Sequence, residues 1–152
     1  MTPSSTPTSG QQASPFLDTL ARLTSYRHLE PFLSAALHEA VQATHCQAGS
    51  LLLVSGSTRR VREGEMSPES VKQISHWEQT LEERLLSSSW RIAADESLPV
   101  YTHVVKGTEH LLVNTPLLRG DSVTGSLTVV LAPGDTLSLS RRQVLTSSAR
   151  TI

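Results

Sequence analysis

Few residue types in this chain could carry out chemistry, and its single thiol is the first to consider. The 152 residues include one cysteine and six histidines. Cys46 cannot form a disulfide within the chain, and a lone free cysteine usually serves as a small buried hydrophobe. We therefore assign Cys46 to packing rather than to thiol chemistry.

The histidines do not show the spacing of a metal centre. A zinc-binding helix places two ligands four residues apart, and no histidine here forms such a pair with another ligand. The adjacent His45 and Cys46 converge poorly on one ion. No Gly-rich phosphate loop and no Ser-His-Asp arrangement can be argued from the spacing. The pattern predicts a protein that is not an enzyme and has no metal site. Whether a cofactor binds, and which one, is unknown from these residues.

Two histidines, His103 and His110, could face a pocket because they lie in or beside an irregular stretch of sequence. An axial haem ligand is one interpretation of either residue. A surface or loop histidine is the commoner role.

The aromatic side chains indicate a binding cavity. Aromatic residues make up only 4% of the chain, and both tryptophans fall between residues 65 and 105. Binding cavities are apolar and aromatic with a few polar groups, so Trp77 and Trp90 could form walls. Trp77 could equally complete the apolar stripe of a helix. Asn114 interrupts an apolar strand, and a buried amide needs a hydrogen-bond partner. The predicted ligand-binding residues are Trp77, Trp90, Tyr101, His103 and Asn114.

The charge and hydropathy of the chain exclude several classes of partner. Thirteen basic and fourteen acidic residues give a formal charge of −1, whereas nucleic-acid-binding domains normally carry a basic excess. No apolar run approaches the roughly 20 residues that span a bilayer, and the N-terminus lacks the regions of a signal peptide. A single cysteine suits a reducing compartment. We expect a cytoplasmic protein with no nucleic-acid or membrane partner.

A hairpin between residues 111 and 131 is the element that must position the candidate site. Its two apolar runs, 111–118 and 123–131, are rich in Leu, Val and Thr, which favour strands. The joining Arg119-Gly120-Asp121-Ser122 has the residue types of a tight turn, which also accounts for the Arg-Gly-Asp tripeptide. We expect these two long strands at the centre of a sheet.

Hydrophobic periodicity and capping residues predict the remaining elements. The order of elements favours an α+β domain with a mainly antiparallel sheet. Three arginines in the run 58–63 suit an edge strand. The last helix has no C-cap signal, so we expect it to be cut short at residue 152. The other expected elements are a disordered tail at 1–13, helices at about 15–25, 30–44 and 68–86, strands at 50–54 and 58–63, a short strand at 90–92, a loop at 95–99, and a last helix capped by Ser138 or Ser140.

Three stretches resemble the GAF domain, a small-molecule-sensing module of many bacterial signalling proteins. The first runs from His28-Leu29-Glu30-Pro31-Phe32-Leu33 to Gly49-Ser50-Leu51-Leu52-Leu53-Val54 and is similar to the second helix and first strand of that family. The second, Leu111-Leu112-Val113-Asn114-Thr115-Pro116-Leu117, is similar to a strand that typically ends in Pro-Leu. The third is Val123-Thr124-Gly125-Ser126-Leu127-Thr128-Val129, with its Gly-x-Leu pattern, followed by Leu137-Ser138 at the start of the last helix.

The resemblance implies one domain over residues 14–152 with a central antiparallel sheet of five or six strands. One face would pack on the terminal helices, which often dimerise, and the other would form a pocket with the segment 65–105. The last helix would lead to an output domain, such as a histidine kinase or a cyclase. We expect a sensory domain that binds a small molecule. The alternatives are a ligand-free dimerisation spacer and a PAS-like sensor.

Overall fold

The computed structural model describes residues 15–55, 57–93, 96–105 and 110–152, with side chains from residue 29 onward. The predicted tail at 1–13 lies outside the described residues. The chain divides into two compact units, Met1–Phe32 and Leu33–Ile152. The sheet and its candidate site belong to the second unit, and the single domain predicted over 14–152 stays a prediction.

The two helices predicted at 15–25 and 30–44 form one helix, α1, at Pro15–Ala43, so the predicted break is wrong. Pro31 lies inside this helix, where a proline removes one hydrogen bond at a substantial energetic cost. Its fixed φ is nevertheless helical, and residues 26–30 contain no glycine or turn former that would lead the chain out of the helix. The boundary between the two compact units falls directly after Phe32, one residue beyond this proline.

The end of α1 is closed by a Schellman motif. His45 adopts a left-handed conformation with φ of 54° and donates its N–H to the Gln42 carbonyl at 3.1 Å. The Cys46 N–H reaches the Val41 carbonyl at 3.0 Å. These two bonds satisfy helix-end carbonyls and turn the chain toward the first strand. The predicted end of the helix near Thr44 is confirmed.

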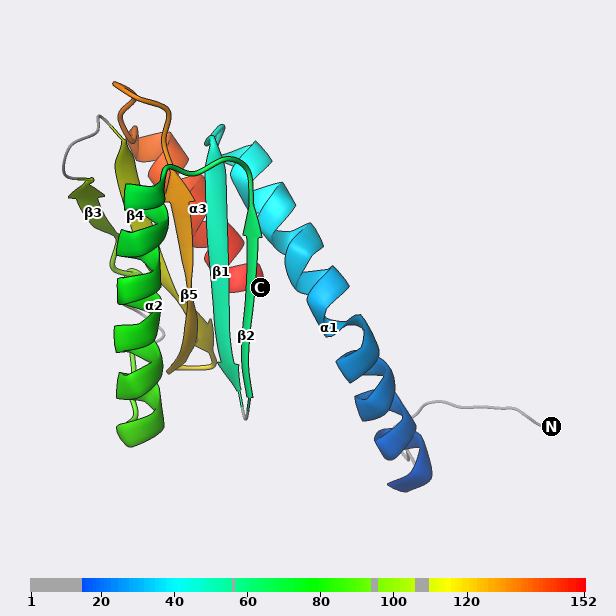
Figure 1. Ribbon diagram of the computed structural model, residues 1–152. Helices are drawn as coiled ribbons and strands as arrows, with labels where there is room; N and C mark the ends of the chain where they lie inside the picture. The colour runs from blue at the N-terminus through cyan, green and yellow to red at the C-terminus, as the bar shows by residue number, and fades with distance from the viewer. Residues whose placement is uncertain (1–14, 56, 94–95, 106–109) are drawn as a thin grey trace. The chain divides into compact units, whose positions relative to one another are not determined.

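The sheet has five antiparallel strands in the order β2-β1-β5-β4-β3 (Figure 1). The predicted hairpin is confirmed as β4 and β5, joined through Gly120 at φ of 65°, and β5 is the middle strand. The predicted α+β class is therefore confirmed, with the charged run at 58–63 on one edge. The strands are β1 at Ala48–Ser55, β2 at Ser57–Glu63, β3 at Tyr101–Val104, β4 at Leu111–Arg119 and β5 at Ser122–Val130.

The segment between residues 90 and 105 differs from its prediction. β3 was not predicted, because all four of its residues are exposed and no alternation marks it. The short strand expected at 90–92 reduces to one bridge between Arg91 and Ser122, supported by the ion pair of Arg91 with Asp121. Residue 95 of the expected loop at 95–99 lies outside the described residues. In the rest of that segment, Leu98 is buried and the Pro99 carbonyl accepts a hydrogen bond from the Thr115 hydroxyl.

Two further helices cover opposite faces of the sheet (Figure 1). α2 at Pro68–Ser87 begins at Ser67, whose hydroxyl accepts from the Ser70 N–H at 3.1 Å. α3 at Leu139–Thr151 begins at Ser138, whose hydroxyl accepts from the Arg141 N–H at 3.2 Å. Both starts are confirmed, and Ser138 rather than Ser140 is the N-cap because its backbone is extended while its side chain reaches the first turn.

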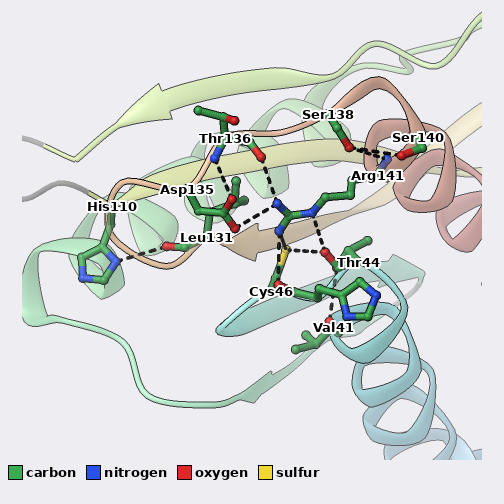
Figure 2. Close-up of polar contacts among 11 residues, drawn as sticks. Val41, Thr44, Cys46, His110, Leu131, Asp135, Thr136, Ser138, Ser140 and Arg141 are labelled. Carbon is green, nitrogen blue, oxygen red and sulfur yellow. Dashed lines mark hydrogen bonds and ion pairs between the residues drawn. The ribbon is translucent and has the colours of Figure 1, made fainter.

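Arg141 fastens the start of α3 to the end of α1 (Figure 2). Its guanidinium donates to the carbonyls of Thr44 at 2.8 Å and His45 at 3.2 Å, beyond the last turn of α1. It also donates to Asp135 Oδ2 and to the Thr136 carbonyl, both at 2.9 Å. A cation at a helix C-terminus is favourable because the carbonyl dipoles point toward it.

Acidification is expected to release this contact. The hydrogen bond from Arg141 is the main reason that the pKa of Asp135 lies below its usual value of 3.8, and the Thr136 N–H adds to the effect while burial opposes it. A carboxyl with a lowered pKa stabilises the folded state above its unfolded pKa and loses that contribution as pH falls through the folded value.

The Asp135→Asn variant should therefore be less stable than the native chain at neutral pH, and the difference should shrink on acidification below pH 3.8. Urea unfolding from neutral pH to about pH 3 measures it. A difference that does not change over this range would contradict the assignment.

Candidate functional site

A partly open cavity of about 520 Å³ lies between α2 and the sheet. It is built from one helix, two inner strands, the edge strand β3 and the loop that follows α2. Its described lining residues are Gln73, His76, Trp77, Thr80, Leu81, Arg84, Trp90, Tyr101, Asn114, Pro116 and Ser126.

The register of the strands brings the sheet residues of this cavity together. Tyr101 pairs with Asn114, and Asn114 pairs with Thr128, so the three lie in one row across the sheet. Pro116 pairs with Ser126 in the next row on the same face. Directly opposed residues of antiparallel strands point to the same side, so these rows form the floor beneath α2.

The helical wall comes from one side of α2. Gln73, Trp77, Thr80 and Arg84 recur at steps of three and four residues, which places them along one stripe of the helix. The stripe that packs on the sheet lies beside it and contains Ser70, Ile74 and Glu78, all buried.

The position of Trp77 differs from the purely apolar stripe that its periodicity suggested. Trp77 is half-buried, packing against the core cluster around Ile74 while also facing the cavity. The fully buried stripe of α2 consists of Ser70, Ile74 and Glu78, so Trp77 lies on its flank. Trp77 therefore takes part in both the wall and the core.

Glu78 is the charged residue that sequence reasoning missed. Its side chain is fully buried, and it accepts from Arg60 Nε at 2.7 Å, Arg62 Nη2 at 3.1 Å and Ser50 Oγ at 2.6 Å. The two arginines were predicted only as charges on an edge strand. Strand β2 pairs Arg62 with Ser50, which places Arg62 on the α2 face of the sheet. Arg60 lies two residues away on the same strand and therefore on the same face. This cluster fixes α2 on the sheet and so positions the helical wall.

The cavity has few polar groups, and they differ in whether they already have a hydrogen-bond partner. Asn114 is partly buried and donates through Nδ2 to Thr128 Oγ1 at 2.7 Å, while no described group bonds its side-chain oxygen Oδ1. Ser126 is 3% exposed, and among the described residues nothing hydrogen-bonds its hydroxyl. The Arg84 guanidinium lies 4.3 Å from the centre of the Trp90 ring, a cation–π contact at the rim.

Four of the five residues predicted for ligand binding line this cavity: Trp77, Trp90, Tyr101 and Asn114. His103 is not among the lining residues. It makes an edge-to-face contact with Trp77, with ring centres 5.8 Å apart, and so supports the wall from behind. Their role in binding stays a prediction. Pro116 could have been found from the sequence, because it lies two residues from Asn114 on the same strand and therefore on the same face.

Cys46 and His110, the other residues considered for chemistry, contact structural elements outside the cavity. Cys46 Sγ lies 3.7 Å from Arg141 and 3.6 Å from the Thr44 carbonyl, beside the contact that joins α3 to α1 (Figure 2). His110 Nδ1 lies 3.3 Å from the Leu131 carbonyl, where β5 ends. Within the part of the chain that the structure describes, no three His, Cys, Asp or Glu side chains form a possible metal site. No described helix is long and apolar enough to cross a membrane.

Comparison with solved structures identifies the fold. A crystal structure of a GAF domain from Pseudomonas syringae pv. tomato, from a protein described as a sensor histidine kinase, matches with a TM-score of 0.53. The two sequences are 14% identical, and the match covers 90% of this chain and 87% of that chain. No protein-family model and no curated protein matches the sequence. The chain therefore has the fold of a GAF domain, as the sequence predicted.

Proposed function

We propose that this chain is a sensory or regulatory GAF-like domain that binds a small molecule between α2 and the sheet, without catalysing a reaction. One observation carries the proposal: both tryptophans of an aromatic-poor chain lie in the wall of one cavity. Its volume of about 520 Å³ falls within the range of small-molecule sites. The described lining offers aromatic surface and hydrogen-bonding groups, and it contains no thiol or carboxylate that could act as a nucleophile.

Strand β4 supplies a physical route from the cavity to the last helix. Asn114 and Pro116 face the cavity, while the alternating residues Val113, Thr115 and Leu117 are buried on the opposite side. That opposite face is covered by α3, which contacts β4. A ligand that moves the floor of the cavity would therefore displace the surface on which α3 rests.

The proposal includes partners outside this chain. The output domain would follow α3, and a histidine kinase is the first candidate because the structural neighbour comes from a protein described as one. A homodimer through the terminal helices is supported by Leu139, which is 71% exposed at the start of α3. The single cysteine supports a cytoplasmic location.

A variant that closes the cavity tests the proposal. Thr80 is exposed on α2 and lines the cavity, so Thr80→Phe places a ring in the opening without disturbing the core. Binding of any metabolite that raises the melting temperature of the native chain should weaken by at least about tenfold in this variant. The matched control is Gln79→Phe, because Gln79 is exposed on the same helix but does not line the cavity. Equal binding by both variants would place the ligand elsewhere.

The second candidate function is a dimerisation spacer that binds no ligand. The exposed Leu139 favours it as much as it favours a sensor dimer. Thermal shifts across nucleotide, haem and metabolite panels, combined with light scattering, separate the two. A dimer that responds to no compound supports the spacer, and a monomer at high protein concentration excludes dimerisation through α3.

A further inference from the structure

The charges around the cavity select among possible ligands. Its described lining contains one permanent cation, Arg84, and no aspartate or glutamate. Within the described part of the chain, no carboxylate or carbonyl accepts from the Arg84 guanidinium, which stacks on Trp90 instead. An arginine in this state has its planar set of N–H donors available, and these match a carboxylate in geometry and charge.

The aromatic residues that line the cavity favour a ligand with a flat, apolar ring. Trp77 and Trp90 lie on the helical side and in the following loop, and Tyr101 lies on the sheet side. Aromatic rings of this size contribute large contact areas and favour stacked or edge-to-face partners. Neither indole N–H is occupied by a hydrogen bond within the described residues, so the walls also donate rather than accept.

The floor holds one unusual polar pair. The Ser126 hydroxyl belongs to a side chain that is only 3% exposed, it lines the cavity, and no described group bonds it. Asn114, one row away on the neighbouring strand, uses Nδ2 on Thr128, and no described group bonds its side-chain oxygen Oδ1. The Ser126 hydroxyl opens into the cavity, where a ligand group that can both donate and accept would take the place of water.

From these three features we infer that the cavity takes an aromatic carboxylic acid that carries a ring hydroxyl. Its carboxylate pairs with Arg84 at the rim, its ring lies between the tryptophans, and its hydroxyl reaches Ser126 and Asn114 on the floor. The inference rests on the proposed function, because it names the class of ligand for the same cavity.

A matched set of three probes tests the charge preference: para-hydroxyphenylacetate, para-hydroxyphenylacetamide and tyramine, which share a ring but are anionic, neutral and cationic. Both tryptophans of the chain line the cavity, so indole emission reports binding there directly, and calorimetry supplies affinities. The acid should bind at least about tenfold more tightly than the amide, since a charge-assisted hydrogen bond is roughly twice as strong as a neutral one. Tyramine should bind most weakly.

Two variants assign the preference to residues. Arg84→Gln should reduce the preference for the acid over the amide to about twofold or less, while Arg84→Lys should retain part of it. Arg142→Gln is the control, because Arg142 is an exposed arginine on α3 that does not line this cavity. Ser126→Ala should remove the advantage of para-hydroxyphenylacetate over phenylacetate without changing the effect of Arg84→Gln.

The outcomes separate this inference from the proposed function. Equal binding of the three probes, or preference for tyramine, overturns the ligand class and leaves the cavity as a small-molecule site. No response to any of the three at millimolar concentration also overturns the ligand class, and the Thr80→Phe comparison then decides the proposed function with other compounds. An acid preference that survives Arg84→Gln overturns the role of Arg84.

Discussion

Replacing Arg60 and Arg62 together by glutamine should lower the free energy of unfolding by about 3–5 kcal/mol, the usual cost of leaving a buried charge uncompensated. The carboxylate of Glu78 is fully buried, whereas the side chains of Arg60 and Arg62 are 41% and 30% exposed. The arginines can return to water when the pair is broken, but the carboxylate cannot. Urea unfolding measures the loss.

A third substitution tests this explanation. Glu78→Met removes the buried charge at similar side-chain length, so in the variant without the two arginines it should restore most of the lost stability. In the native background the same change should cost less than the double arginine substitution, because the two arginines that lose a partner are partly exposed and the one buried partner, Ser50, is a neutral hydroxyl. Arg119→Gln combined with Arg142→Gln removes the same charge from exposed positions and should cost little. If Glu78→Met is equally harmful in both backgrounds, the buried pair does not act as described.

The Gly125→Ala substitution should be among the most damaging single changes, costing at least about 3 kcal/mol. Gly125 lies on the middle strand β5, opposite Leu53 of β1. A Cβ at this position would overlap the carbonyl oxygen of Leu52, which is backbone and cannot move without separating the two strands. This close approach is a physical reason for the glycine in the Gly-Ser-Leu stretch that the sequence singled out.

Gly120→Ala is the matched control for Gly125→Ala. Gly120 has φ of 65° in the turn between β4 and β5, and an added Cβ there meets nothing within 4 Å. The control should therefore cost only the strain of a left-handed alanine, about 1 kcal/mol. Thermal or urea unfolding of the two variants gives the comparison. A loss for Gly125→Ala no greater than that for Gly120→Ala would show that the strands can separate without penalty.

The parts of the fold that were predictable are those specified by neighbouring residues. The turn at 119–122 has a glycine where positive φ is needed, and Ser67-Pro68 supplies an N-cap and a first-turn proline, so both elements could be located from local chemistry. The break predicted before Pro31 was wrong because the cost of one proline can be outweighed by the rest of a long helix. β3 was missed because an exposed four-residue edge strand has no hydrophobic alternation.

Only part of the candidate site was predictable, because some of its residues stand out by type and others do not. Trp77 and Trp90 were conspicuous by type, and Asn114 was conspicuous as an amide in an apolar strand. Ser126 and Arg84 were not, because serine and arginine are ordinary residues on a strand or a helix. Their importance depends on a register that pairs Ser126 with Pro116 and on a helix end that places Arg84 against Trp90.

By itself, the sequence determined four of the five strands, the starts of α2 and α3 and the class of fold, because these depend on periodicity, capping and turn residues within a few positions of one another. Only the tertiary structure decided where charge is buried and which surface is hollow. Glu78 meets Arg60 at a separation of eighteen residues, and Asn114 meets Thr128 at fourteen. These contacts arise from strand register and helix docking, which set the positions of side chains that carry no local signal of their partners.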